Sequence, residues 1–109
     1  MIGSLKHRFT IMQAVETLDQ AGGKTTVWQE LSQDSKFWGS LKEVSGELRY
    51  QFMQQTLNVT HKIQLRLRTG LSQENRLVKG GRYFKILSLT KDEQHHKKML
   101  LLVREMDTL

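Results

Sequence analysis

The alternating segment from Val59 to Arg68 constrains the fold of this chain more than any other feature. Its odd-numbered positions are mostly apolar and its even-numbered positions are polar or basic. The first set is Val59, His61, Ile63, Leu65 and Leu67, and the second is Thr60, Lys62, Gln64, Arg66 and Arg68. Because successive side chains of a strand point to opposite faces, this segment is predicted to be a strand with one apolar face and one basic, solvated face.

A pair of glycines marks a hairpin further along the chain. A polar loop at residues 72–75 precedes a short predicted strand at Arg76–Lys79, and Gly80 and Gly81 follow it directly. Two adjacent glycines accept the positive φ angles that a tight hairpin requires. The returning strand is predicted over residues 82–89.

The rest of the chain also favours short strands. They are predicted at residues 5–15, 25–31, 37–44 and 99–106. Gly22 and Gly23 relax the backbone at a turn between the first two. Gly39, inside the third, indicates a bulge or a close approach of another backbone. The last strand is apolar on both faces, which suggests a central strand or one that a neighbouring subunit covers.

One segment, at about residues 45–55, changes to a helical period. Ser45 is a suitable N-cap, and Glu47 lies in the first turn, where the helix dipole favours an acid. Leu48 and Phe52 share one face at a spacing of four residues. The segment is therefore predicted to be a short helix that needs the sheet for stability.

These elements predict one mainly β domain over residues 1–109, a small barrel or sandwich of six to seven strands with one short helix. Closing the sheet would remove its exposed edges. A chain of 109 residues is the length of a single domain.

Composition limits the environment and the partners. The chain has no cysteine, which fits a reducing compartment, and we find no secretory signal and no apolar run of membrane-spanning length. Its net charge of +6 favours polyanionic partners such as nucleic acid or an acidic protein surface. The same charge also occurs in small domains that need it only for solubility.

The residues give no support for catalysis, a cofactor or a metal site. His95 and His96 lie in a charged segment, where a solvated loop is favoured over a metal site. His61 lies on the apolar face of its strand and is interpreted as a packed histidine bonded to the backbone. The aromatic residues alternate along strands, which favours core and interface anchors over a base-stacking platform. They are Trp28, Phe37, Trp38, Tyr83 and Phe84.

An ordered set of motifs resembles the tailed-phage head–tail adaptor family, also called head-completion, head-closure or stopper proteins. The set begins with Arg8-Phe9-x-Ile11, Asp19-x-x-Gly22-Gly23, Trp28, Trp38 and Ser45-Gly46. It continues with Thr60-His61-x-Ile63-x-Leu65-Arg66-x-Arg68, Gly70-Leu71 and Arg76-Leu77-x-x-Gly80-Gly81-Arg82-Tyr83-Phe84-x-Ile86. The resemblance covers nearly the whole chain. It departs from the family where Glu43-Val44 stands in place of a frequent proline.

The resemblance implies a structural protein of a phage or prophage rather than an enzyme. In that family a small β-barrel assembles into a ring, typically dodecameric, beneath the portal and its adaptor. The ring closes the DNA-filled head and offers a docking surface to the tail or tail-completion protein. The expected location is the connector of the virion, and the host cytoplasm before assembly, with no membrane partner.

Two residue sets are candidates for this role. Lys62, Arg66, Arg68 and Arg82 are predicted to make weak, non-specific contacts with DNA in the channel. Leu100 and Leu102 are predicted to contact a neighbouring subunit or the adaptor. Gly22, Gly23, Gly80 and Gly81 are predicted to have structural roles in turns.

Two alternatives stay open at this point. One is a free-standing nucleic-acid-binding barrel of the OB or SH3-like type, which would bind short DNA and release it steeply with salt. The other is a neighbouring neck or tail-terminator protein built on a similar barrel.

Overall fold

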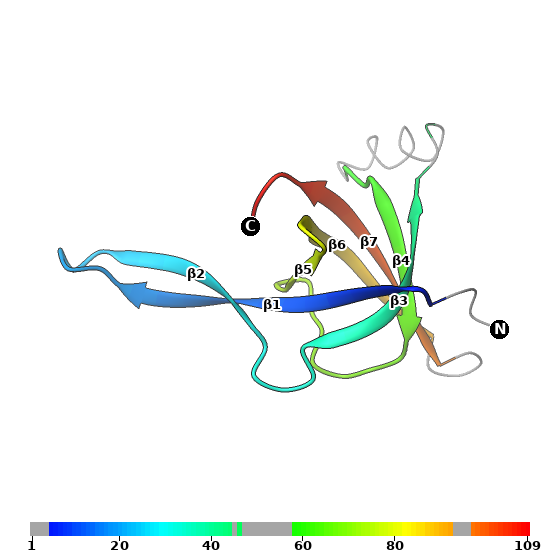
Figure 1. Cartoon of the computed structure of the whole chain (residues 1–109), viewed down its shortest axis with the longest axis horizontal. Coiled ribbons are helices and arrows are strands. Elements are labelled where there is room, and N and C mark those ends of the chain that lie inside the picture. Colours follow the sequence, from blue (N-terminus) through cyan, green and yellow to red (C-terminus); the bar gives the residue numbers. More distant parts are fainter. Residues whose placement is uncertain (1–4, 45, 47–57, 93–96) are drawn as a thin grey trace.

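The computed structural model describes residues 5–44, 46, 58–92 and 97–109, and this part of the chain is all-β (Figure 1). Its seven strands are β1 (His7–Leu18), β2 (Lys24–Glu30), β3 (Lys36–Glu43), β4 (His61–Arg66), β5 (Arg76–Lys79), β6 (Arg82–Asp92) and β7 (Lys98–Met106). They form one antiparallel sheet in the order β2-β1-β3-β4-β7-β6-β5. An additional pairing of β1 with β5 curls the sheet into a partly closed barrel. The predicted mainly β fold is confirmed.

The core fills this barrel with side chains from six of its strands. Its largest fully buried residues are Phe9, Ile11, Val59, Ile63, Leu65, Leu77, Phe84, Met99, Leu101 and Val103. The ring of Phe9 stacks on Phe37 at 5.2 Å between centroids and meets Phe84 edge-on at 6.1 Å. Offset and edge-on aromatic pairs of this kind stabilise a core beyond the area that they bury. The described barrel therefore has one continuous apolar interior.

The alternation that predicted β4 is confirmed. Val59, Ile63 and Leu65 are buried, whereas Arg66 is exposed. The strand is shorter than the predicted segment, but its backbone pairing continues at both ends. The amide of Thr60 donates to Val103 O at 2.9 Å, and the amide of Leu67 donates to Lys97 O at 2.8 Å. Both ends of the predicted strand are thus hydrogen-bonded to their neighbours, although they do not continue the regular β-strand.

The β5–β6 hairpin has the predicted turn. Gly80 and Gly81 have φ angles of 52° and 84°, and Lys79 pairs with Arg82 across the turn. Two consecutive positive φ angles match the right-handed twist of a hairpin and are strained for residues with a Cβ. This hairpin fixes the register of β6, which extends to Asp92, beyond the predicted end of the strand at residue 89.

Strand β1 extends further than predicted, and its second half leaves the barrel. Residues from His7 to Met12 pair with β3 and β5, whereas residues from Gln13 to Leu18 pair only with β2. Strand β2 itself pairs only with β1. Figure 1 shows the resulting two-stranded arm projecting away from the barrel. We refer to residues 13–30 as the arm.

The turn at the end of the arm is the predicted one. Asp19 Oδ1 accepts hydrogen bonds from the amides of Ala21 at 3.0 Å and Gly23 at 2.7 Å. Gly22 has a φ angle of 84°. An aspartate that bonds its own downstream backbone stabilises a turn locally. Hydrogen bonds within the turn therefore stabilise the end of the arm, although the arm projects away from the core.

Two further expectations concern Gly39 and the helix. A Cβ built on Gly39 would lie 2.9 Å from Gln64 O in the neighbouring strand, so the predicted close backbone approach is confirmed. The helix predicted at about residues 45–55 lies, apart from Gly46, outside the described residues.

Candidate subunit-contact surface

The outward-facing side chains of β3, β4 and β7 form one mixed surface, which we call the outer basic face. It comprises Ser40, Lys42, Lys62, Gln64, Arg66, Lys98, Leu100 and Leu102. These residues alternate with core residues along each strand, so they lie on the side of the sheet away from the core. Register places Lys62 opposite both Lys42 and Leu102, Gln64 opposite Leu100, and Arg66 opposite Lys98.

The structure therefore brings together two sets that were predicted to have different roles. Leu100 and Leu102 are half-buried and lie directly across from the β4 residues Gln64 and Lys62. Neither Lys62 nor Arg66 forms an ion pair within the described residues. The result is an apolar pair beside two cations that form no ion pair with another described residue. Such a surface suits an acidic partner that also carries apolar side chains.

Arg68 has a different position. Its guanidinium donates through Nη2 to Asp34 O at 2.5 Å and through Nη1 to Lys36 O at 3.3 Å, and Nε donates to Thr69 O at 3.1 Å. Each nitrogen of the guanidinium thus has a backbone partner. Arg68 ties the segment between β2 and β3 to the end of β4.

Arg82 is also engaged within the protein, at one end of the barrel. Its Nε and Nη2 donate to the two carboxylate oxygens of Glu105 at 2.8 Å and 3.0 Å. The hydrogen bond from Arg82 lowers the pKa of Glu105, and the bond to Glu105 raises the pKa of Arg82. The positive charge of Arg82 is therefore balanced locally. Its strand parity places it on the opposite side of the sheet from Lys62 and Arg66.

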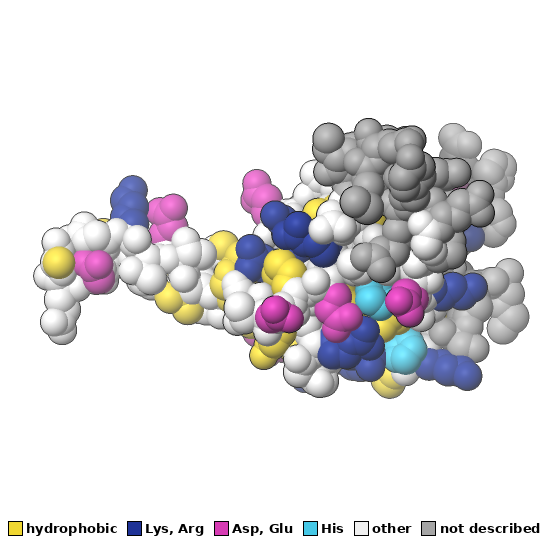
Figure 2. Space-filling view, turned by 90° about the horizontal axis from the view of Figure 1, so that it is seen from above, with side chains coloured by type: hydrophobic (Ala, Val, Ile, Leu, Met, Phe, Trp, Pro, Cys, Tyr) yellow, Lys and Arg dark blue, Asp and Glu magenta, His cyan; other side chains and the backbone are white. Residues whose placement is uncertain are grey.

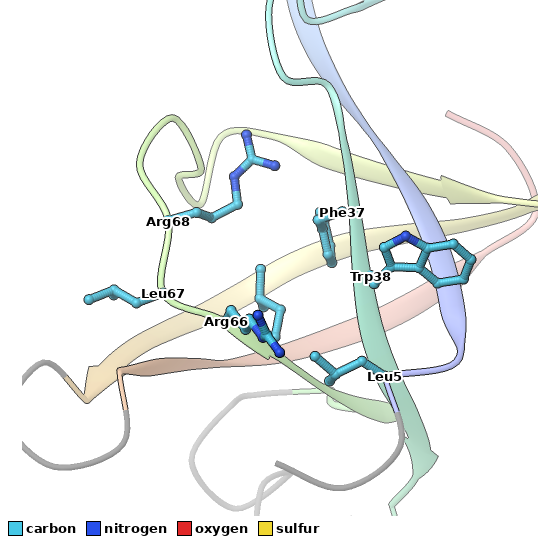
Figure 3. A pocket seen from close by; sticks show the side chains of 7 residues that line it. Leu5, Phe37, Trp38, Arg66, Leu67 and Arg68 are labelled. Atoms are coloured by element: carbon cyan, nitrogen blue, oxygen red, sulfur yellow. The ribbon is translucent and has the colours of Figure 1, made fainter. Parts of the chain in front are cut away.

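A groove opens where Arg66 and Arg68 meet β3 (Figure 3). It has a volume of about 490 Å³ and is lined by Leu5, Phe37, Trp38, Leu65, Arg66, Leu67 and Arg68. Trp38 is 51% exposed, and the guanidinium of Arg8 lies 5.0 Å from its ring centroid. The groove continues the character of the outer basic face, because it combines apolar walls with cations.

The aromatic residues divide between core and surface. Phe37 and Phe84 are buried in the core, whereas Tyr83 is half-buried. Trp28 is half-buried at the base of the arm, with the guanidinium of Arg76 4.2 Å from its ring centroid. The predicted core anchors are thus confirmed for the two phenylalanines. The role of Trp38 as an interface anchor stays a prediction.

The structure confirms that His61 is packed, although its contacts include side chains that were not predicted. Its ring meets Phe84 edge-on at 5.8 Å between centroids, and Nδ1 lies 2.9 Å from Thr60 Oγ1. Nε2 lies 4.0 Å from Glu105 Oε1. His95 and His96, which were predicted to lie in a solvated loop, are outside the described residues.

The described residues contain no group of three or more His, Cys, Asp or Glu side chains that could hold a metal ion. In that part of the chain no helix has the length and apolar character needed to cross a bilayer.

Sequence reasoning missed Glu105 and the arm. Glu105 is 23 residues from Arg82 and meets it only through the pairing of β6 with β7. The arm contains the alternating residues of an ordinary hairpin, and no local signal shows that it leaves the barrel. Both features follow from long-range register.

The similarity to solved structures supports the fold. The chain is similar to the solution structure of protein SF1141 from Shigella flexneri 2a, with 23% identity, a TM-score of 0.73 and coverage of 95% of each chain. It is also similar to a chain in the virion of a native gene transfer agent particle, with 19% identity and a TM-score of 0.60. That match covers 94% of this chain and 96% of the other. No curated protein sequence matches the chain.

Structural matches at such low identity support the fold alone, whereas a match to a family model identifies the family. The model for the phage head completion protein matches residues 1–106, which is nearly the whole chain. The match agrees with the ordered motifs. The chain therefore belongs to the phage head completion protein family, whose members are structural, non-enzymatic components of the virion.

Proposed function

We propose that this protein forms a ring beneath the portal and its adaptor, closes the DNA-filled head and offers the tail its docking surface. The observation that supports this most directly is the outer basic face. Leu100 and Leu102 are half-buried on the outer side of the sheet, and apolar side chains on an outer surface often mark an interaction site. An apolar pair with cations beside it on an outer surface is typical of a protein contact.

The proposed contact is heterologous, because one patch on each copy meets a different patch on the next. Interfaces of this kind close into rings when the rotation between copies returns to its start. We propose a dodecamer as the assembled state, in line with the family resemblance. The portal or adaptor would lie on one side of the ring and the tail or tail-completion protein on the other.

The test is docking onto DNA-filled, tail-less heads. Replacing both leucines, L100D with L102D, puts two carboxylates into the proposed contact and should abolish docking while the monomer stays folded. The matched control is S32D with T108D, which adds the same charge at two exposed positions elsewhere. Normal head closure by the first variant, with circular dichroism showing it folded, would refute the leucine contact.

DNA contact by the same face is a second candidate function. It is favoured by one observation: Lys62 and Arg66 form no ion pair among the described residues. In the ring these two side chains would contact the phosphate backbone weakly and without sequence readout. Arg68 and Arg82 stay candidates for DNA contact from outside this face, although both already bind protein groups.

A salt titration separates the alternatives. A free-standing nucleic-acid-binding barrel would bind short duplex DNA as a monomer and lose that binding steeply between 50 and 200 mM salt, as roughly expected for several phosphate contacts. A ring component should bind little DNA as a monomer. Docking on free tails instead of heads would indicate a neck or tail-terminator protein.

A further inference from the structure

We propose that the arm of one copy docks on the outer basic face of the next copy, with Leu18 and Glu16 meeting the surface around Leu102 and Lys62. This inference rests on the proposed ring and adds the partner surfaces to it. Among the described residues the strands of the arm pair only with each other beyond Met12, so a partner surface could add contacts that the arm lacks in its own chain.

The arm lacks the support that a hairpin normally needs. Beyond Met12 its two strands pair only with each other, and an isolated two-stranded hairpin is marginally stable in water. Leu18 is 74% exposed and Val27 is 39% exposed. These are two of the three exposed large hydrophobic residues in the described chain, and the third is Trp38 beside the groove. Covering the face that carries Leu18 would therefore support the arm and remove exposed apolar area, whereas Val27 lies on the opposite face.

The distribution of charge indicates which surface would cover the arm. The arm carries Lys24 against three acids, Glu16, Asp19 and Glu30, so its formal charge is −2. The whole chain carries +6, which leaves +8 on the remainder. An acidic arm and a basic barrel are complementary when they come from different copies. Figure 2 shows acidic and hydrophobic side chains next to each other at the end of the arm.

The two surfaces also match in the arrangement of their residues. Glu16 and Leu18 alternate with Thr17, so both point to the same face of the arm. On the barrel, Leu102 lies directly across from Lys62. The arm presents Leu18 between Glu16, two positions earlier on β1, and Lys24, directly across on β2, whereas the barrel presents Leu102 beside Lys62. The contact would place leucine against leucine and carboxylate against ammonium.

The recipient has to be another copy. The arm projects away from the barrel, so its tip cannot reach the outer basic face of its own chain (Figure 1). The two docking patches are different, which makes the contact heterologous and able to repeat from copy to copy. Repetition of this one contact would therefore give every copy in the ring the same orientation relative to the next.

Cross-linking between two engineered cysteines tests this contact, because the natural chain has none. One full-length variant carries L18C and a second carries L102C, and the two are mixed at concentrations where the protein self-associates, and also on filled heads. Docking should make the mixed disulfide form about tenfold faster than in the control mixture of L18C with S72C, because docked cysteines have a raised effective concentration. Ser72 is exposed in the loop before β5, away from the proposed contact.

Charge reversal provides a second readout. The variants E16K and K62E should each weaken self-association, measured by sedimentation, by about two- to fivefold. Mixing E16K with K62E should restore association, since the altered arm then meets the altered face. The controls are E74K and K91E, two charge reversals at exposed positions outside the arm and the outer basic face.

The outcomes separate the docking contact from the ring. If heads carry rings but the Leu18 and Leu102 variants cross-link no faster than the control, the arm proposal is wrong and the ring stands. If no ring forms on filled heads under any condition, the proposed function fails first. If K62E weakens binding to short duplex DNA while self-association is unchanged, the face contacts nucleic acid and the arm proposal is overturned.

Discussion

Arg82 and Glu105 form a two-pronged ion pair that joins β6 to β7 at one end of the barrel. The Nε–Oε2 and Nη2–Oε1 distances are 2.8 Å and 3.0 Å. Thr60 Oγ1 accepts a hydrogen bond from the Glu105 amide at 2.8 Å, and His61 Nε2 lies 4.0 Å from Glu105 Oε1. Glu105 thus links the strands on both sides of β7. Planar, two-pronged pairs of this kind are stronger and more specific than single contacts.

This pair predicts a loss of stability in acid. The pKa of Glu105 is lowered by the hydrogen bond from Arg82, so its contribution is present above the ordinary carboxyl pKa and is lost as the pH falls through the folded value. The raised pKa of Arg82 has no consequence in this range, because its contribution is lost only in strong alkali. E105Q should cost about 0.5–1 kcal/mol at pH 6, since both groups are partly exposed.

The measurement is urea unfolding of both proteins at pH 6 and pH 3. The difference in unfolding free energy between the natural chain and E105Q should be smaller at pH 3, which lies below the ordinary carboxyl pKa, so that the unfolded chain gains a proton at Glu105 that the ion pair in the folded chain resists. An equal difference at both values of pH would show that Glu105 acts through packing. E74Q, which alters an exposed loop carboxylate, is the control.

Gly39 predicts a steric effect. In G39A the new methyl group would lie 2.9 Å from the carbonyl oxygen of Gln64 and 3.3 Å from Ile63 Cγ2. The backbone oxygen belongs to the neighbouring strand and cannot rotate away, so β3 and β4 would have to separate. The expected cost is about 1–3 kcal/mol, as for other overpacked sites. Thermal unfolding followed by circular dichroism measures it.

Gly46 offers the matched control for this substitution. A Cβ built there has no heavy atom within 4 Å. G46A should therefore leave the melting temperature close to that of the natural chain. A melting temperature for G39A equal to that of G46A would contradict the close approach.

The local pattern was sufficient to predict the strands of the barrel. The alternation at Val59–Arg68 and the glycine pair at Gly80 and Gly81 each determine backbone geometry over a few residues, so sequence alone identified β4 and the β5–β6 hairpin. Both depend on side-chain parity and φ angles, which are properties of neighbouring residues. At Gly39 the sequence left a bulge or a close approach of another backbone open, and the structure shows the close approach.

Features that depend on register could not be predicted in the same way. Nothing near Arg68 shows that its guanidinium reaches the carbonyls of Asp34 and Lys36, more than 30 residues earlier. Arg68 was therefore grouped with Arg66 by alternation alone. Likewise, the departure of the arm at Met12 follows from the end of its pairing with β5, which is a property of the closed sheet.

Asn75 predicts a loss of stability through an unsatisfied polar group. It is 8% exposed, and its side chain accepts from the Ser72 amide at 2.8 Å and donates from Nδ2 to Met12 O at 3.2 Å. N75A leaves both backbone groups without these partners and should cost about 1–3 kcal/mol in urea unfolding. N75D keeps the acceptor for Ser72 but puts a carboxylate oxygen beside Met12 O, so it should also destabilise. Retained stability in both variants would contradict a role for this bond in holding the loop to β1.

Substitution by alanine is predicted to have different effects on stability at the nearby arginines Arg66 and Arg68. R68A removes the guanidinium that holds the carbonyls of Asp34 and Lys36, and should lower the unfolding free energy by about 1–2 kcal/mol. R66A removes an exposed side chain of the outer basic face and should change it by less than about 0.5 kcal/mol. Urea unfolding compares the two, and docking on filled heads gives the second measurement. There R66A should weaken docking although it is fully folded, because it removes a cation from the proposed contact. Unchanged docking by R66A would mean that Arg66 has no binding role. An unfolding curve for R68A that overlies that of the natural chain would mean that Arg68 has no structural role.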